Sequence, residues 1–244
     1  MPALPQIDYG SRLRVGLLVP SGNSVAEPEI RAMLPAHVSM LVTRLALRGS
    51  SKSELMRMLD ELDAASALLA DAEVNVIVFH CTAVSTFAPE LAEGIRERIQ
   101  GASGIACFTT ADAILNGLRR LNARRVSLLT PYIDEVHQRE IAFLESNGFV
   151  VIGGANLGIN TNTDMARLSP EAILDWAKDN IDTRADACLI SCTAIKSAPA
   201  IAQLESLSGV PVLTSNQSMV WHLLRSNGIA GNGASYGRLF SIQP

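Results

Sequence analysis

The stretch NVIVFHCTA, residues 75–83, joins a short apolar run to a Cys-Thr-Ala triplet, and ACLISCTA, residues 187–194, does the same. The two cysteines, Cys81 and Cys192, lie 111 positions apart. The stretches RVGLLVP at 14–20 and RVSLLTP at 125–131 keep that offset. The chain is therefore predicted to contain an internal repeat, in which one structural unit occurs twice with one cysteine thiol in each copy.

Around these stretches, short apolar runs alternate with longer segments of helical period. This alternation predicts a parallel sheet with helices on both faces. We expect strands near 13–19, 39–46, 75–79, 105–108, 125–129, 149–154, 187–191 and 211–213. We expect helices near 26–34, 52–72, 87–100, 109–122, 133–147, 169–181, 197–207 and 215–226.

A third matched pair extends the repeat, because GIACFTTADAILNGLRRLN from Gly104 and GVPVLTSNQSMVWHLLRSN from Gly209 share one pattern. The predicted fold is therefore α/β, with two four-stranded parallel-sheet β-α units related by a pseudo-twofold axis and helices on both faces. The halves are expected at 1–122 and 123–244, with the extreme C-terminus packing back on the first half. Ligands in open α/β sheets bind at the carboxyl ends of the strands, so the active site is expected in the cleft between the halves.

Composition excludes several classes of function. The chain has 244 residues, 48% hydrophobic and 18% charged, which is typical of a folded protein with a sizeable core. A formal net charge of −4 without a basic stripe argues against nucleic acid as a partner. No apolar run approaches the roughly 18 residues that span a bilayer, so no membrane partner is expected. The N-terminal residues lack an apolar signal core, and we expect a cytoplasmic protein.

The four cysteines are expected to be free thiols, because the cytoplasm keeps thiols reduced. The spacing of Cys188 and Cys192 does not match a zinc site. His80 and Cys81 are neighbours in an extended segment and should point to opposite faces, so no metal is expected. Cys107 and Cys188 lie in predicted strands and are interpreted as packing residues.

The two Cys-Thr-Ala triplets are the candidate catalytic elements. Each cysteine falls where a buried strand turns into the next helix, and backbone N–H groups in such a turn can lower the pKa of a thiol. Those groups would come from Thr82 and Ala83 in one half and from Thr193 and Ala194 in the other. A buried structural cysteine is the alternative for either residue alone. The matched register of the two triplets favours a catalytic pair.

Two further loops should border the cleft. Pro20-Ser21-Gly22-Asn23-Ser24 offers the Asn23 amide and a glycine that lets backbone approach a ligand, and its repeat mate Thr130-Pro131-Tyr132 offers a phenol. Ordinary turns and helix caps are the alternative. The polar segment 157–164 is expected to be a lid loop. Residues 214–216 are interpreted as a helix cap. The lone histidines are interpreted as surface or packing residues. Residues 48–50 are a candidate contact for a carboxylate.

With these motifs in place, the chain resembles the Asp/Glu racemase superfamily, in the branch that holds maleate cis-trans isomerases and arylmalonate decarboxylases. The resemblance runs from RVGLLVPSGN to the final YGRLF. TTADAILNGLRRLNARRVSLLTPYIDEV is similar to the decarboxylases, which carry Gly in place of the first-half cysteine. The isomerases keep both cysteines, a Pro-Ser-x-Asn loop and a Tyr after the fifth strand. Cys81, Cys192, Ser21, Asn23 and Tyr132 match that pattern.

The resemblance implies a cofactor-independent isomerase that converts maleate, a small dicarboxylate, into fumarate. Cys81 would add as a thiolate, the former double bond would rotate, and Cys192 would act as an acid or guard the opposite face. Ser21 and Asn23 would contact a carboxylate, and the other donors would be Thr82, Ala83, Thr193, Ala194 and Tyr132. The resemblance also implies a homo-oligomer, a dimer or larger.

Three alternatives stay open. The first is a two-base racemase of an amino acid or hydantoin, in which each thiol serves one face of a stereocentre. The second is a decarboxylase of a substituted malonate, against which Cys81 counts. The third is a small-acid sensor or thiol switch without turnover, whose thiols would titrate near the reference pKa of about 8.5.

Overall fold

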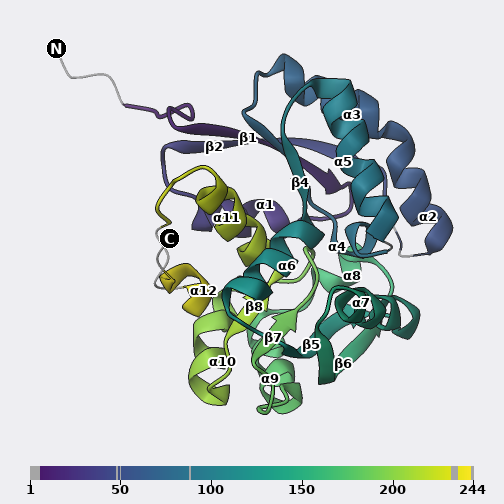
Figure 1. The fold of residues 1–244 in the computed structure, drawn as a ribbon, viewed down its shortest axis with the longest axis vertical. Coiled ribbons are helices and arrows are strands. Elements are labelled where there is room, and N and C mark those ends of the chain that lie inside the picture. Colours follow the sequence, from purple (N-terminus) through teal and green to yellow (C-terminus); the bar gives the residue numbers. More distant parts are fainter. Residues whose placement is uncertain (1–5, 48, 50, 88, 232–235, 243–244) are drawn as a thin grey trace.

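The structure is a computed structural model that describes residues 6–47, 49, 51–87, 89–231 and 236–242. It contains two four-stranded sheets, with strand orders β2-β1-β3-β4 and β6-β5-β7-β8 (Figure 1). All pairs of neighbouring strands are parallel. The strands are β1 Leu13–Pro20, β2 Val38–Leu45, β3 Val76–Phe79, β4 Cys107–Thr109, β5 Arg125–Tyr132, β6 Val150–Ile159, β7 Ala187–Ile190 and β8 Val212–Thr214.

Helices follow the strands and cover both faces of each sheet (Figure 1). The α-helices are α1 Ala26–Met33, α2 Lys52–Arg57, α3 Leu62–Asp71, α4 Thr82–Ser85, α5 Pro89–Ser103, α6 Thr110–Arg120, α7 Asp134–Ser146, α8 Asn162–Met165, α9 Pro170–Asn180, α10 Ile201–Ser208, α11 Ser215–Ser226 and α12 Arg238–Ser241. Two 3₁₀ turns, η1 Met58–Glu61 and η2 Ala198–Ala200, complete the described elements. None of the described helices is long and apolar enough to cross a membrane.

The repeat seen in the sequence is a structural repeat. In the first sheet Val15 of β1 pairs with Val76 of β3. In the second sheet the residues 111 positions later, Val126 of β5 and Ala187 of β7, form the corresponding pair. The predicted fold class, two related four-stranded parallel-sheet units, is confirmed.

Three predicted elements differ from the structure. The helix expected over 197–207 is divided into η2 and α10. The helix expected over 52–72 is divided into α2, η1 and α3. The segment 157–164, expected to be a lid loop, continues as strand and then forms α8. β6 reaches Ile159 because it pairs with Tyr132 at the end of β5, after register shifts along the ladder. Thr161 then caps α8 by accepting the Asp164 N–H at 3.2 Å.

Two helices cross between the halves. Ile114 and Leu118 of α6 belong to the same buried cluster as Val126 and Leu128 of β5 in the second sheet. The chain approaches closely there, because a Cβ added at Gly117 of α6 would lie 2.9 Å from a methyl carbon of Leu213 in β8.

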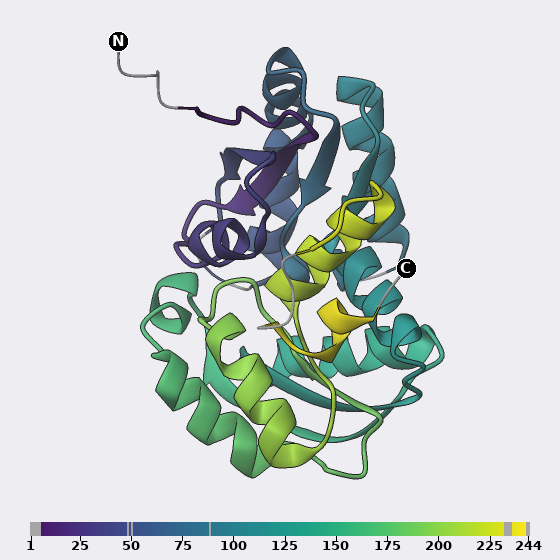
Figure 2. The ribbon, with the colours of Figure 1, turned by 90° about the vertical axis from the view of Figure 1, so that its left-hand side faces the viewer.

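In the opposite direction, α11 packs against α1 and α6 and rises beside the first half (Figures 1 and 2). Tyr236 continues this return, since its hydroxyl donates to the Ala32 carbonyl at 3.2 Å. The first residues of α6 and α11 are thereby held between the two sheets. The division at residue 122 stays a prediction.

Candidate active site

The first cysteine turn follows β3 and forms the start of α4. Cys81 has extended backbone angles, φ −144° and ψ 109°, and directly precedes this four-residue helix. Its side chain is buried, with 4% of its surface exposed. The backbone N–H groups of Val84 and Ala83 point at the sulfur and act to lower the thiol pKa. Ala83, one of the two donors expected from the sequence, therefore lies beside the sulfur, and the second donor is Val84 in place of Thr82.

The second cysteine turn follows β7 in the same way. Cys192 is 2% exposed, and the Ala194 N–H donates to its Sγ at 3.2 Å. The sulfur also lies 3.7 Å from the Sδ of Met165 at the end of α8. Met165, the residue that directly follows the segment predicted as a lid, therefore lies against the second thiol.

The first residue of α11 joins the two turns. Ser215 Oγ accepts a hydrogen bond from Thr82 Oγ1 at 2.9 Å and another from the Cys192 N–H at 3.0 Å. The thiols are close enough that charge on Cys192 raises the pKa of Cys81. The fold therefore brings together the two cysteines that the repeat singled out.

Asn23 reaches across from the first half to the second cysteine turn. Its Nδ2 donates to the Thr193 carbonyl at 3.1 Å and to Thr193 Oγ1 at 3.0 Å. Its Oδ1 accepts the N–H groups of Val25 and Ala26. Because Thr193 Oγ1 accepts from Asn23, the Thr193 hydroxyl proton is left free to point elsewhere. Asn23 thus fixes the orientation of a hydroxyl beside Cys192.

Tyr132 ends β5 and is 4% exposed. Its hydroxyl is within hydrogen-bonding reach of the Cys192 thiol and acts to lower the pKa of that thiol. Burial raises the pKa of Tyr132 itself well above its ordinary value, so the phenol stays protonated and can donate. The two thiols therefore have different neighbours, since the Tyr132 hydroxyl acts to lower the pKa of Cys192 and not that of Cys81.

A buried polar chain that sequence reasoning missed lies behind the turns. His80 Nε2 lies 2.8 Å from Asn216 Oδ1, and His80 Nδ1 lies 3.0 Å from Thr110 Oγ1. Asn216 Nδ2 donates to Glu29 Oε2 at 2.7 Å and to the Thr193 carbonyl at 3.3 Å. Burial lowers the pKa of His80 to about 4, so the imidazole is neutral and holds the Asn216 amide in one orientation.

The sequence profile of the arylmalonate decarboxylase family matches residues 15–240. The chain belongs to this family. It is 30% identical to the maleate isomerase of Nocardia farcinica, over 87% of this chain and 89% of that protein. It is 39% identical to the arylmalonate decarboxylase of Bordetella bronchiseptica, over 57% of this chain and 59% of that protein.

A solved structure adds a chemical detail. A cysteine-to-serine mutant of the Nocardia farcinica maleate cis-trans isomerase, with a covalently bound succinylcysteine intermediate, has a TM-score of 0.86 and 28% identity. The match covers 93% of this chain and 98% of that one. These similarities confirm the family resemblance inferred from the sequence, and they indicate that this member of the arylmalonate decarboxylase family is an isomerase enzyme.

One prediction about the thiols of this family member is wrong. The cysteine turns were expected to lower the thiol pKa, yet the pKa is raised to about 12 for both Cys81 and Cys192. Burial is the largest cause for each, and it outweighs the backbone donors. The carboxylate of Glu140 raises both values further, and Glu29 adds to the effect on Cys192. Both thiols are therefore protonated in the substrate-free enzyme.

The remaining residues singled out from the sequence make other contacts. Ser21 is exposed, and its hydroxyl accepts the Leu47 N–H at 3.1 Å and lies 3.3 Å from the Leu47 carbonyl oxygen, away from the cysteines. Cys188 is fully buried within β7, and Cys107 is half-buried with its thiol donating to the Arg96 carbonyl. Both fit the packing role expected of them. Residues 48 and 50 of the candidate carboxylate contact lie outside the described residues.

For Ser215 and Asn216, a role as part of a helix cap was preferred over a role as hydroxyl and amide donors to the site. Thr214 is indeed the cap of α11, in a capping box with Gln217. The two residues after it instead face the cysteine turns. Thr110, at the same place in the first half, gave a weak signal for this arrangement.

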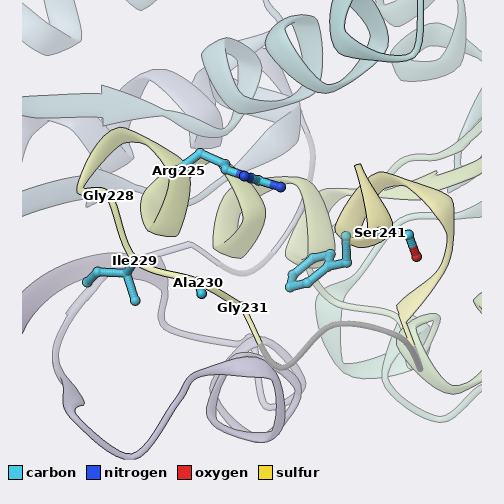
Figure 3. A pocket seen from close by; sticks show the side chains of 7 residues that line it. Arg225, Gly228, Ile229, Ala230, Gly231 and Ser241 are labelled. Carbon is cyan, nitrogen blue, oxygen red and sulfur yellow. The ribbon is translucent and has the colours of Figure 1, made fainter. Parts of the chain in front are cut away.

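No metal-binding group of three or more His, Cys, Asp or Glu residues occurs in the part of the chain that the structure describes. A surface pocket of about 300 Å³ lies between the end of α11 and α12, and neither active-site cysteine lines it (Figure 3). Its one basic side chain, Arg225, donates to the Ile242 carbonyl. This pocket is separate from the candidate active site.

Proposed function

We propose that the chain is a cofactor-independent cis-trans isomerase of a small dicarboxylate, converting maleate into fumarate. The observation that carries the proposal is the pair of buried thiols in matched turns, of which Cys192 has its pKa lowered by the nearby Tyr132 phenol. Two thiols around one small space suit addition to a double bond from one side and proton control from the other. The succinylcysteine in the Nocardia farcinica isomerase supports a sulfur–carbon adduct as the intermediate.

In the proposed reaction, the Cys81 thiol gives its proton to solvent water and takes a proton back after the product has left. In between, the thiolate sulfur forms a bond to one olefinic carbon of maleate. The electron pair of the double bond moves into the adjacent carboxylate as an enediolate. Donors around that carboxylate stabilise the charge. Candidates are the backbone N–H groups of the two turns at Thr82, Ala83, Thr193 and Ala194, together with the Tyr132 and Thr193 hydroxyls.

The former double bond is now a single bond and rotates by half a turn. The electron pair then returns to reform the double bond, the sulfur–carbon bond breaks, and fumarate leaves with no net gain or loss of atoms. Cys192, beside Tyr132, would guard the opposite face or supply a proton. Asn23 holds the Thr193 turn in place throughout. Ser21 stays part of the proposed binding loop through its backbone, since its carbonyl is anchored by Arg44 together with that of Asn23.

The test is conversion of maleate by the purified protein, followed by proton NMR in heavy water. Fumarate should appear, and no carbon dioxide should be released. The Cys81→Ala and Cys192→Ala variants should each lose several orders of magnitude in turnover, whereas the variants at the two packing cysteines, Cys107→Ala and Cys188→Ala, should not. An equal loss in all four would indicate a shared effect on stability and would count against the catalytic roles.

A second candidate, decarboxylation of a substituted malonate, is favoured by the 39% identity to the Bordetella bronchiseptica decarboxylase. Carbon dioxide release from phenylmalonate in the same NMR experiment would support it. Deuterium incorporation with loss of optical rotation would instead support a racemase. The homo-oligomeric state and the cytoplasmic location expected from the sequence stay predictions.

A further inference from the structure

The repeat places a carboxylate at the same position in each half. Glu29 lies in α1 and Glu140 in α7, again 111 positions apart. Each reaches the end of the cysteine turn in the opposite half. Glu29 Oε1 accepts the Ala198 N–H at 3.0 Å, beyond Cys192, and Glu140 Oε1 accepts from Thr86 Oγ1 at 3.4 Å, beyond Cys81. The fold therefore positions one carboxylate behind each thiol.

The surroundings of these two carboxylates differ. Both Glu29 oxygens accept short N–H hydrogen bonds, one from Ala198 and one from Asn216. Glu29 is also half-buried and lines an outer surface pocket together with Lys196. Glu140, by contrast, is only 2% exposed. Ser191 lies close enough to act to lower the pKa of Glu140, but among the described residues neither its hydroxyl nor Glu140 Oε2 has a partner in hydrogen-bond geometry. Glu140 is thus the less well solvated of the two carboxylates.

The groups that face Glu140 come from three directions. From its own helix, Arg139 acts to lower the pKa of Glu140, but its guanidinium stacks 4.5 Å from the Phe87 ring centroid. Tyr132 faces Glu140 from β5, and Cys81 and Cys192 face it from the two cysteine turns. The charge of Glu140 raises the pKa of all three groups. β6, which also packs on α7, carries no titratable side chain.

No ion pair to Glu140 occurs among the described residues, because Arg139 pairs only with Glu135, at 3.9 Å. Burial is therefore the largest influence on Glu140 and raises its pKa to about 7. The same cause raises the pKa of Glu29 to about 7, against the pull of its hydrogen bonds.

We propose that Glu140 takes up a proton when a dicarboxylate binds and thereby couples substrate binding to pH. The inference rests on the proposed function, because it concerns the charge of that substrate. A dianion that enters beside an unpaired buried carboxylate is repelled. A proton on the free Oε2 removes that repulsion and leaves Oε1 available to Thr86. At pH 8 Glu29 is mostly ionised and is expected to remain so on binding, because a proton on either of its oxygens would compete with an N–H donor already in place.

The experiment is calorimetric titration with succinate, a saturated dicarboxylate that binds without turnover and is ionised from pH 7 to 9. Buffers of different ionisation enthalpy report the protons taken up on binding. For a single group that titrates near 7, wild-type protein should take up about 0.9 proton at pH 8, and its Kd should rise about 50-fold from pH 7 to pH 9. Cys81 and Cys192, with pKa values of about 12, do not titrate in that range.

Glu140→Gln is the decisive variant, because a neutral amide of the same shape stands in for the protonated carboxyl. It should take up almost no proton, and at pH 9 it should bind succinate about 100-fold more tightly than wild type. Glu29→Gln is the matched control at the equivalent position of the other half, and it should keep the proton uptake.

Binding without proton uptake in wild type, or uptake that persists in Glu140→Gln, overturns the inference and leaves the proposed function standing. Uptake that is lost in Glu29→Gln instead assigns the proton to the wrong carboxylate and also overturns it. Failure of both succinate and maleate to bind would overturn the proposed function and the inference together. If Glu140→Gln does not fold, proton uptake by wild type still decides whether binding is coupled to pH, and Glu29→Gln decides which carboxylate is responsible.

Discussion

The substrate-free enzyme should keep both active-site thiols protonated far into the alkaline range, and raising the pH in the presence of a small neutral alkylating agent tests this directly. Burial raises the pKa of Cys81 and Cys192 to about 12. Against a reference thiol pKa of about 8.5, that difference leaves roughly three thousand times less thiolate at neutral pH. At pH 8 only about one protein thiol in ten thousand would be ionised.

The assay follows the rate of iodoacetamide addition to each cysteine by peptide mass spectrometry between pH 6 and pH 10. The slope is the informative quantity, since burial also slows access of the reagent at every pH. The logarithm of the rate should rise by one for each pH unit, with no inflection up to pH 10. A free thiol in the same tube provides the control and should level off near its pKa of about 8.5. A plateau below pH 9 at either cysteine would refute the reasoning.

Three further outcomes follow from the site. Asn23→Ala leaves the Val25 N–H, the Ala26 N–H and Thr193 Oγ1 without their hydrogen-bond partner. The free energy of unfolding, measured by urea titration, should therefore fall by about 3 kcal/mol. A fall below about 1 kcal/mol would mean that other hydrogen bonds replace the lost ones. Tyr132→Phe should lower maleate turnover, measured by steady-state kinetics, by a factor of roughly 10² to 10³. Thermal melts should show a change in stability of less than about 1 kcal/mol. Unchanged turnover would exclude the phenol as a hydrogen-bond donor to the reaction. His80 has its pKa lowered from 6.5 to about 4 in the folded state. Between these values the unfolded chain binds a proton that the native chain does not, so this stability is complete above pH 6.5 and is lost as the pH falls toward 4. The loss between pH 7 and pH 4.5 amounts to about 2.4 kcal/mol and should be absent from His80→Gln when urea unfolding is compared at these two pH values.

Most of the fold could be predicted from the sequence because its signals are local. Each strand is an apolar run between turn residues, and the constant offset of 111 between Cys81 and Cys192 showed that the two halves share one register. The crossing of α6 and α11 could not be predicted in the same way. The apolar face of α6 shows that the helix is buried, but nothing in its period says that Ile114 and Leu118 pack under the second sheet.

The contacts of Ser215 and Asn216 with the cysteine turns could not be predicted for a similar reason. Thr214, Ser215 and Asn216 form a good capping sequence, and Thr214 does cap α11. The residue that corresponds to Asn216 in the first half is Ala111, so the repeat offered no second amide for comparison. The sign of the thiol pKa shift was missed because it depends on burial within the assembled halves. The number of backbone donors in a turn, which the sequence does indicate, is the weaker influence.

The repeat also shows where the two halves have diverged, and this divergence bears on the chemistry. Tyr132 corresponds to Ser21, whose side chain is exposed and bonded to Leu47. Asn23 corresponds to Asp134, which is exposed at the start of α7.

Both distinctive side chains, Tyr132 and Asn23, therefore serve the Cys192 turn. A two-base racemase must remove and return a proton on opposite faces, which favours matched surroundings for its two bases. Here the Cys192 thiol lies beside the Tyr132 phenol and the Thr193 hydroxyl that Asn23 holds. The hydrogen bonds that lower the pKa of the Cys81 thiol come from backbone N–H groups instead. Such unequal surroundings suit a nucleophile and a separate proton donor, which is the division of roles that addition, rotation and elimination require.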